Sequence, residues 1–150
     1  VFSSGGVQSN LCPQVADLFS RRLGPVAGII SSIMWLGNTN PEIKRCVFIP
    51  VDLVYLEWQD LSNLIQSISD VAYFTDNPLP LVVHISASTL QICKQVFNEM
   101  LTLTGYPVHK FIQKFKVQHK ESNFNPHCLT NLNYFADWEK FTREYLGGFI

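Results

Sequence analysis

Apolar and polar positions alternate along the chain in the manner of an α/β protein. The run from Leu81 to Ile85 is almost wholly apolar, which is typical of a strand buried in a parallel sheet. A polar turn at 86–89 follows, and apolar residues then recur at helical spacing from Leu90 to Leu101. Gly105 is placed to end that helix in a left-handed turn, and Val108 begins another apolar run. This order predicts a strand–helix–strand unit.

The first quarter of the chain predicts at least one helix. Residues 13–23 carry apolar positions at helical spacing, and Gly24 and Pro25 are expected to end that helix. Residues 26–36 are apolar almost throughout. Periodicity does not decide between a buried strand and a buried helix for such a run, so both remain open.

Further strands and helices are predicted on either side of the central unit. Cys46 to Ile49 and Leu53 to Trp58 are candidate strands, and Asp60 can cap a helix that follows them. A last helix, at about 134–146, places aromatic residues on one face. We therefore expect residues 1–150 to form a single α/β domain of three layers, with a mostly parallel sheet and helices on both faces.

Composition adds an expectation about partners. Hydrophobic residues make up 47% of the 150 residues and charged residues only 15%, against about 25% charged residues in a typical globular protein. So few charges favour an apolar surface that meets a protein partner or forms a homodimer. The net charge of −1 limits any nucleic-acid site to a local patch. Because the chain begins at Val1 without Met, we expect a fragment of a larger protein.

Cysteine spacing and apolar run lengths bear on location. The cysteines, Cys12, Cys46, Cys93 and Cys128, include no C-x-x-C pair, which argues against a zinc site or a dense disulfide framework. We therefore expect reduced thiols in an intracellular, cytoplasmic protein. No membrane span is expected, because the longest apolar run is well short of about 20 residues.

The polar turn at 86–89 is the first candidate site. Ser86, Ser88 and Thr89 stand where a strand ends and a helix begins, and the free N–H groups of a helix N-terminus favour an anion. These residues can bind a phosphate of a nucleic-acid backbone. The alternative is that they only cap the helix.

The second candidate site is a basic and aromatic segment at 109–120. Its lysines, Lys110, Lys114, Lys116 and Lys120, can neutralise phosphates, and an exposed Phe111 or Phe115 can stack on a base of single-stranded RNA. The alternative is that the phenylalanines are core residues and the lysines form a solvated face.

Motifs for catalysis are missing. The chain has neither G-x-x-x-x-G-K-[ST] nor G-x-G-x-x-G, and its four histidines lack the spacing of a metal site. We therefore predict no catalytic residue, no cofactor and no metal. A minority alternative makes Cys128 the nucleophile of a hydrolase or transferase, with a distant histidine as its base.

One segment resembles a known family. The residues are Leu81-Val-Val-His-Ile85, Ser86-Ala-Ser-Thr89, Cys93, Val96, Met100 and Gly105. This pattern is similar to the start of the second RecA-like domain of DEAD-box-type helicases. The family's later T-D-x-x-x-R-G-x-D and H-R-x-G-R-x-x-R motifs are missing, since Arg143 is the only arginine after Val117. The resemblance therefore implies a degenerate helicase-like domain, as in Tudor-domain proteins of the piRNA pathway, that does not turn over ATP.

These observations predict a non-catalytic binding module. In the first version the module contacts single-stranded RNA through the turn at 86–89 and the lysines of 110–120. In the second version it is a protein–protein interaction or scaffold domain that binds no nucleic acid.

Overall fold

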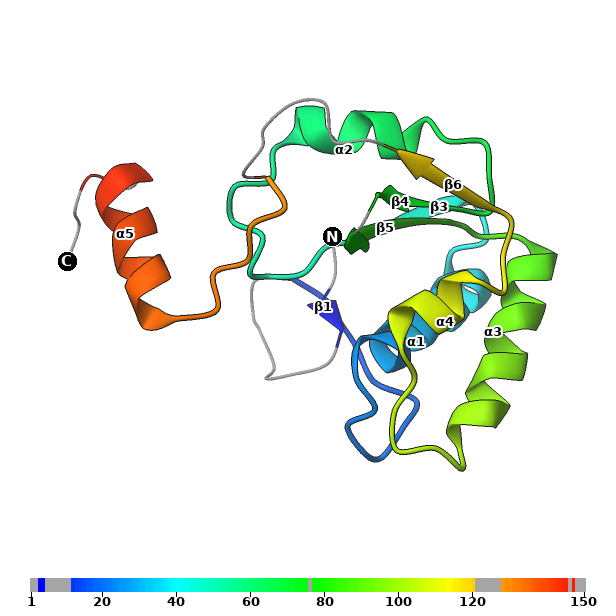
Figure 1. The fold of residues 1–150 in the computed structure, drawn as a ribbon. Coiled ribbons are helices and arrows are strands. Elements are labelled where there is room, and N and C mark those ends of the chain that lie inside the picture. Colours follow the sequence, from blue (N-terminus) through cyan, green and yellow to red (C-terminus); the bar gives the residue numbers. More distant parts are fainter. Residues whose placement is uncertain (1–2, 5–11, 76, 121–127, 146, 148–150) are drawn as a thin grey trace.

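The computed structural model describes residues 3–4, 12–75, 77–120, 128–145 and 147. Its elements form an α/β fold, which confirms the predicted class (Figure 1). The strands are β1 (Ser3–Ser4), β2 (Gln14–Val15), β3 (Arg45–Phe48), β4 (Val71–Phe74), β5 (Asn77–His84) and β6 (Val117–Lys120). The helices are α1 (Pro25–Thr39), α2 (Trp58–Ile65), α3 (Ala87–Met100), α4 (Val108–Ile112) and α5 (Phe135–Tyr145).

The main sheet has the strand order β3-β5-β4-β6 and is mixed. β5 pairs antiparallel with both β3 and β4, and only the β4–β6 pair is parallel. The prediction of a mostly parallel sheet is therefore wrong for the described residues. The physical reason is the short connection between β4 and β5: only residues 75 and 76 separate them, and so short a link joins antiparallel neighbours.

Helices pack on both faces of this sheet. Val71, Leu81 and Val83 point to the face that packs against α1, α3 and α4. Ala72 and Val82 point to the opposite face, where α2 covers them. Figure 1 shows α2 on one side of the strands and the other three helices on the other side. The alternation of side chains along each strand thus builds two separate apolar cores.

Helix α1 begins where the sequence predicted that a helix would end. Pro25 occupies the first turn, for which its fixed φ is suited, and Gly24 precedes it with φ 83°, a conformation that favours glycine. Of the two alternatives for residues 26–36, a buried strand or a buried helix, the structure thus shows the helix. The helix predicted over 13–23 is absent, and the Leu18 N–H there donates to Ser31 Oγ of α1 (2.9 Å) instead of to a helical carbonyl.

Helix α2 replaces part of a predicted strand. Leu53 to Trp58 forms no strand, and α2 begins at Trp58. Asp60 lies at the third helical position rather than at the cap, and its Oδ2 accepts a hydrogen bond from the Glu57 N–H (2.8 Å). The Glu57 side chain accepts from the Asp60 N–H in return, which completes a capping box.

Helix α3 follows β5 as predicted, but the segment after it differs from the prediction. The C-cap of α3 is Leu101, in a right-handed conformation, and Gly105 does not have a positive φ. Val108 begins α4 instead of a strand, and β6 pairs with β4 rather than with β5. The predicted strand–helix–strand unit with two parallel neighbours is therefore wrong.

Helix α5 stands apart from the layers of the sheet and its covering helices (Figure 1). It spans Phe135–Tyr145, close to the predicted 134–146, and none of its residues is buried. Within the described residues, no helix combines the length and the apolar character that crossing a lipid bilayer requires.

Candidate functional site

The serine turn, residues 86–89, caps helix α3. Ser86 is the N-cap residue, and its Oγ accepts a hydrogen bond from the Thr89 N–H (3.2 Å). Thr89 is buried, and its hydroxyl donates to the carbonyl of His84 (2.6 Å). Ser88 is exposed, and its Oγ lies 2.8 Å from Ser86 Oγ.

The hydroxyl protons of the serine turn are all directed at protein oxygens. Each hydroxyl has one proton, and that of Thr89 goes to His84. Ser86 then donates across its 2.9 Å contact with Thr89 Oγ1, and Ser88 donates to Ser86. These bonds agree with the capping role of Ser86. They do not decide the phosphate prediction, because the backbone N–H groups of a helix N-terminus also hold an anion.

The structure brings one of the predicted lysines to the serine turn's end of the sheet. The Lys116 backbone N–H donates to Asp70 Oδ2 (3.3 Å), and the Asp70 carbonyl accepts from the His84 N–H (2.8 Å). The Lys116 side chain is exposed. Lys120 lies at the opposite end of β6, where its carbonyl accepts from the Thr75 N–H (2.8 Å).

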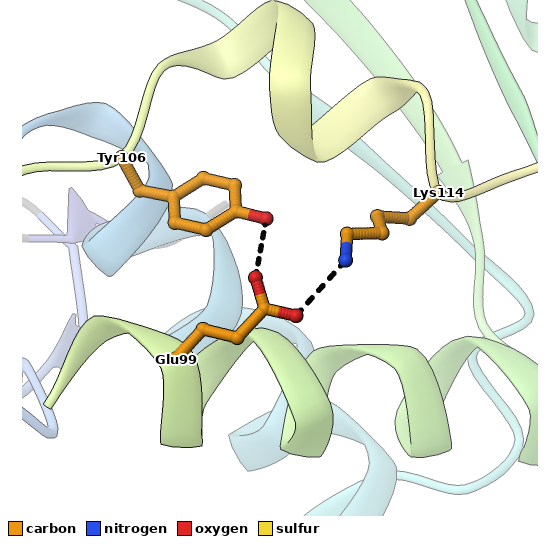
Figure 2. Close-up of polar contacts among 3 residues, drawn as sticks. All are labelled: Glu99, Tyr106 and Lys114. Atoms are coloured by element: carbon orange, nitrogen blue, oxygen red, sulfur yellow. Dashed lines mark hydrogen bonds and ion pairs between the residues drawn. The ribbon is translucent and has the colours of Figure 1, made fainter.

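The other two lysines contact acidic and aromatic groups near the C-terminal end of α3. Figure 2 shows Glu99 between Tyr106 and Lys114: the Tyr106 hydroxyl and the Lys114 Nζ each donate to one carboxylate oxygen, both at 2.9 Å. Lys110 Nζ lies 4.7 Å from the centre of the Tyr106 ring. At 1.5 Å per residue, Glu99 is about 20 Å along the helix from Ser86. Lys110 and Lys114 therefore do not add to a phosphate site at the serine turn.

The three groups in Figure 2 shift one another's protonation. The hydrogen bond from Lys114, followed by that from Tyr106, lowers the pKa of Glu99. The hydrogen bond to Glu99 raises the pKa of Lys114. Burial, together with the hydrogen bond to Glu99, raises the pKa of Tyr106. These shifts are typical of a structural ion pair that holds α3 to the segment around α4.

The phenylalanines of the basic segment are core residues. Phe111 has no exposed surface, and Phe115 packs against it with ring centres 4.9 Å apart. Phe111 is therefore not available to stack on a base, and Phe115 is half-buried. This outcome agrees with the alternative in which the segment buries its phenylalanines and solvates its lysines.

The cysteine hypothesis named Cys128, and the structure buries this thiol. Cys128 has no exposed surface, and its neighbour His127 lies outside the described residues. Burial raises the pKa of Cys46 to about 11 and that of Cys93 to about 12. A catalytic thiol needs access to substrate and a lowered pKa. In the part of the chain that the structure describes, no cluster of three or more metal-ligating side chains occurs.

An aromatic surface on α5 is the feature that the search for sites in the sequence missed. We call Phe135, Trp138, Phe141 and Tyr145 the α5 aromatic face. Tyr55, from the segment before α2, contacts this face edge-on: its ring centre is 5.3 Å from that of Phe141 and 5.1 Å from that of Tyr145. The steps of three and four residues between these aromatics were visible in the sequence, but their exposure was not.

Only part of the α5 aromatic face is covered by the rest of the domain. Phe135 is 77% exposed, Tyr145 62% and Trp138 40%. A hollow of about 270 Å³ between α5 and residues 130–132 adjoins it and includes Tyr55, Asp137 and Lys140 in its lining. The arrangement is an amphipathic helix that is fixed to the domain by Tyr55 and carries exposed aromatic rings.

The fold and its surfaces define an α/β domain with a mixed four-stranded sheet. No family model matches the chain, and no curated protein does. Among solved structures, the chain is similar to molybdopterin-guanine dinucleotide biosynthesis protein A from Archaeoglobus fulgidus, with a TM-score of 0.63 and 14% sequence identity. The match covers 86% of this chain and 66% of that protein. At this identity the likeness shows the α/β fold alone.

Proposed function

We propose that this domain is a non-catalytic protein-binding module whose α5 aromatic face inserts into an apolar groove of a partner protein. The exposure of α5 carries the proposal: the helix buries none of its residues, although aromatic side chains occupy one side of it. Large exposed aromatic patches on monomers are typical of interaction sites.

The spacing of the aromatics fits recognition of a helix by a groove. Phe135, Trp138 and Tyr145 stand at positions i, i+3 and i+10, on one side of the helix, as the anchors of such ligands do. The Trp138 indole N–H donates to the Leu132 carbonyl (3.2 Å), and Tyr55 contacts Phe141. These contacts set the direction of α5 before a partner arrives, which lowers the entropy cost of binding.

Site-specific photo-crosslinking tests this proposal. A photoreactive amino acid at position 145 is expected to link one partner protein, whereas the same group at position 143, on the opposite side of α5, is expected to link none. Tyr145→Ser should weaken the affinity for that partner by roughly 30-fold, equivalent to about 2 kcal/mol for an aromatic anchor. The matched control Arg143→Ser should leave the affinity unchanged.

Two results would contradict this proposal. The first is equal crosslinking from positions 145 and 143, which would show that the partner does not bind the aromatic side of α5 in preference to the opposite side. The second is a partner whose affinity is the same for the Tyr145→Ser protein. Because the Tyr145 side chain is 62% exposed, we expect Tyr145→Ser to leave the stability of the domain unchanged. A loss of folding would therefore not explain either result.

Contact with single-stranded RNA, as in a helicase-like domain of RecA-like form, is the second candidate. Lys116 favours it, since this exposed lysine lies at the same end of the sheet as the serine turn. RNA affinity that falls steeply with salt, and that Lys116→Ala weakens for every sequence, would support it. An unchanged anisotropy of labelled RNA at low salt would exclude it.

A further inference from the structure

Strand β3 is an edge strand whose outer backbone groups are open. Within the described residues it pairs only with β5, and Cys46 lies opposite Val83. The Ile85 N–H donates to the Lys44 carbonyl (2.8 Å). Because hydrogen-bonded pairs alternate in an antiparallel ladder, Lys44, Cys46 and Phe48 direct their backbone groups to β5. Arg45 and Val47 therefore direct theirs to the open edge.

The other edge of the sheet is polar by comparison. β6 reads Val-Gln-His-Lys and follows Lys116, whereas β3 reads Arg-Cys-Val-Phe. Lysines on an edge strand hinder the addition of another strand. β3 also has one charged residue, Arg45, and follows Lys44, but both of these side chains donate to carbonyls of their own domain, Arg45 to Ile65 and Lys44 to Pro41. β3 is therefore the edge that is open to a further strand.

An apolar hollow lies beside β3. It measures about 420 Å³ and lies between the C-terminal part of α1 and the strand. Trp35 and Ile43, two apolar residues of its lining, are each 37% exposed. Its lining consists of Pro13, Trp35, Leu36, Asn40, Ile43, Arg45, Cys46 and Val47. A strand that adds to β3 would cover this hollow and remove these side chains from water.

We propose that the occupant of this edge is a second copy of the chain, whose β3 adds antiparallel to the first. The sequence of β3 is self-complementary in the required register. With a two-fold axis at Cys46, Arg45 of each copy lies opposite Val47 of the other, and these are the residues whose backbone groups face outward. No like charges meet, and two hydrogen-bonded pairs supply about four main-chain hydrogen bonds.

The same axis brings the two hollows together. A two-fold axis perpendicular to the sheet keeps both α1 helices on one side of the joined sheets. Trp35 and Ile43 of each copy then flank the joint, so apolar burial adds to the main-chain bonds. The product is a continuous eight-stranded sheet with β6 at both ends, built from two four-stranded sheets. Lys120 on β6 hinders the addition of another strand at that edge, so the assembly stops at two copies.

Light scattering on the whole chain, combined with a pair of proline variants, tests the dimer. The wild-type protein is expected to approach twice its 17.1 kDa chain mass as its concentration rises. Val47→Pro removes an outward N–H that makes no bond to β5, so the strand should persist while the protein stays monomeric. The matched control is His119→Pro, because the bonds from Val71 and Thr75 to Lys116 and Lys120 leave the His119 N–H facing outward on β6. This control should remain dimeric.

Amide exchange of the wild-type protein tests the same proposal without any variant. The Arg45 and Val47 amides should exchange more slowly as protein concentration rises, whereas the His119 amide should not change. A monomer mass at every concentration, a Val47→Pro dimer, or concentration-dependent protection at His119 instead would overturn the proposal. A dimer that Val47→Pro leaves intact and Tyr145→Ser dissociates would place self-association on α5, and this outcome also overturns it. The proposed partner binding of α5 is independent of all these results except that last one.

Discussion

Two adjacent serines on α1 differ in how their hydroxyls are satisfied. Both are buried, with Ser31 1% and Ser32 0% exposed. Ser31 Oγ donates to the Ala27 carbonyl (2.8 Å) and accepts from the Leu18 N–H (2.9 Å). Ser32 Oγ has no hydrogen-bond partner among the described residues. A buried hydroxyl without a partner destabilises the folded state by about 1–3 kcal/mol.

Replacing these serines by alanine should therefore have opposite effects. Ser32→Ala is expected to raise the free energy of unfolding by about 1 kcal/mol, because it removes an unsatisfied polar atom. Ser31→Ala is expected to lower it by about 1 kcal/mol or more, since it leaves the Leu18 N–H without its acceptor. Urea denaturation of both variants beside the wild type measures the difference. A loss of stability in both variants would contradict the assignment for Ser32.

The Glu99 carboxylate makes the ion pair with Lys114 dependent on pH. Its pKa is lowered in the folded state, so its contribution to stability is present above the pKa of an unfolded glutamate, about 4.3, and is lost as pH falls through the folded value. Glu99→Gln should therefore reduce stability by more at pH 7 than at pH 3.

Denaturant unfolding at the two pH values checks this prediction. The effect at pH 7 should be small, because both side chains are 38% exposed and surface ion pairs contribute little. Asp137→Asn, on the exposed helix α5, is a suitable control for the change of charge. An effect of Glu99→Gln that is the same at both pH values would show that the lost contact, rather than the charge, matters.

Residue roles were predictable where the chemistry is local. Ser86 was a predicted cap, because cap residues act on amides two or three positions away. The partner of Lys114 was not predictable, since Glu99 lies on another helix and only the folded chain brings them together. The same holds for Thr89, whose hydroxyl donates to the carbonyl of His84 at the end of the preceding strand.

At the scale of elements, the capping box of α2 offers a test. Asp60→Ala removes the carboxylate that accepts the Glu57 N–H, and this carboxylate belongs to a residue that is 2% exposed. The variant is expected to lose about 1 kcal/mol of stability. Asp60→Asn keeps an acceptor oxygen and should lose less. Thermal unfolding followed by circular dichroism ranks the variants, and equal losses would contradict the capping role.

Elements were predicted well where length and end signals agreed. α3 has a serine cap and apolar residues at helical spacing over its 14 residues, and α5 repeats its aromatics at steps of three and four. β4 was missed because Val71–Phe74 has only four residues and no alternation of polar positions. Residues 13–23 have helical spacing, but in the folded chain the Leu18 N–H donates to Ser31 of α1. A contact between distant residues cannot be predicted from a local sequence pattern.

At the scale of the whole molecule, the α/β class was predictable and the sheet order was not. The class follows from the mixture of apolar runs and helical repeats along the chain. The order β3-β5-β4-β6 depends on which strands meet, and pairing is non-local. The prediction of a mostly parallel sheet failed for the same reason, because β5 is flanked by antiparallel neighbours.

The central β4–β5 hairpin has a consequence for how the chain folds. Its strands close a loop of two residues, 75 and 76, whereas β4 and β6 are 42 residues apart between Phe74 and Val117 and must enclose α3 and α4. The entropy cost of closing a loop rises with its length. The hairpin therefore favours a nucleus from which the sheet grows outward in both directions, with β6 the last strand to join and the first to leave.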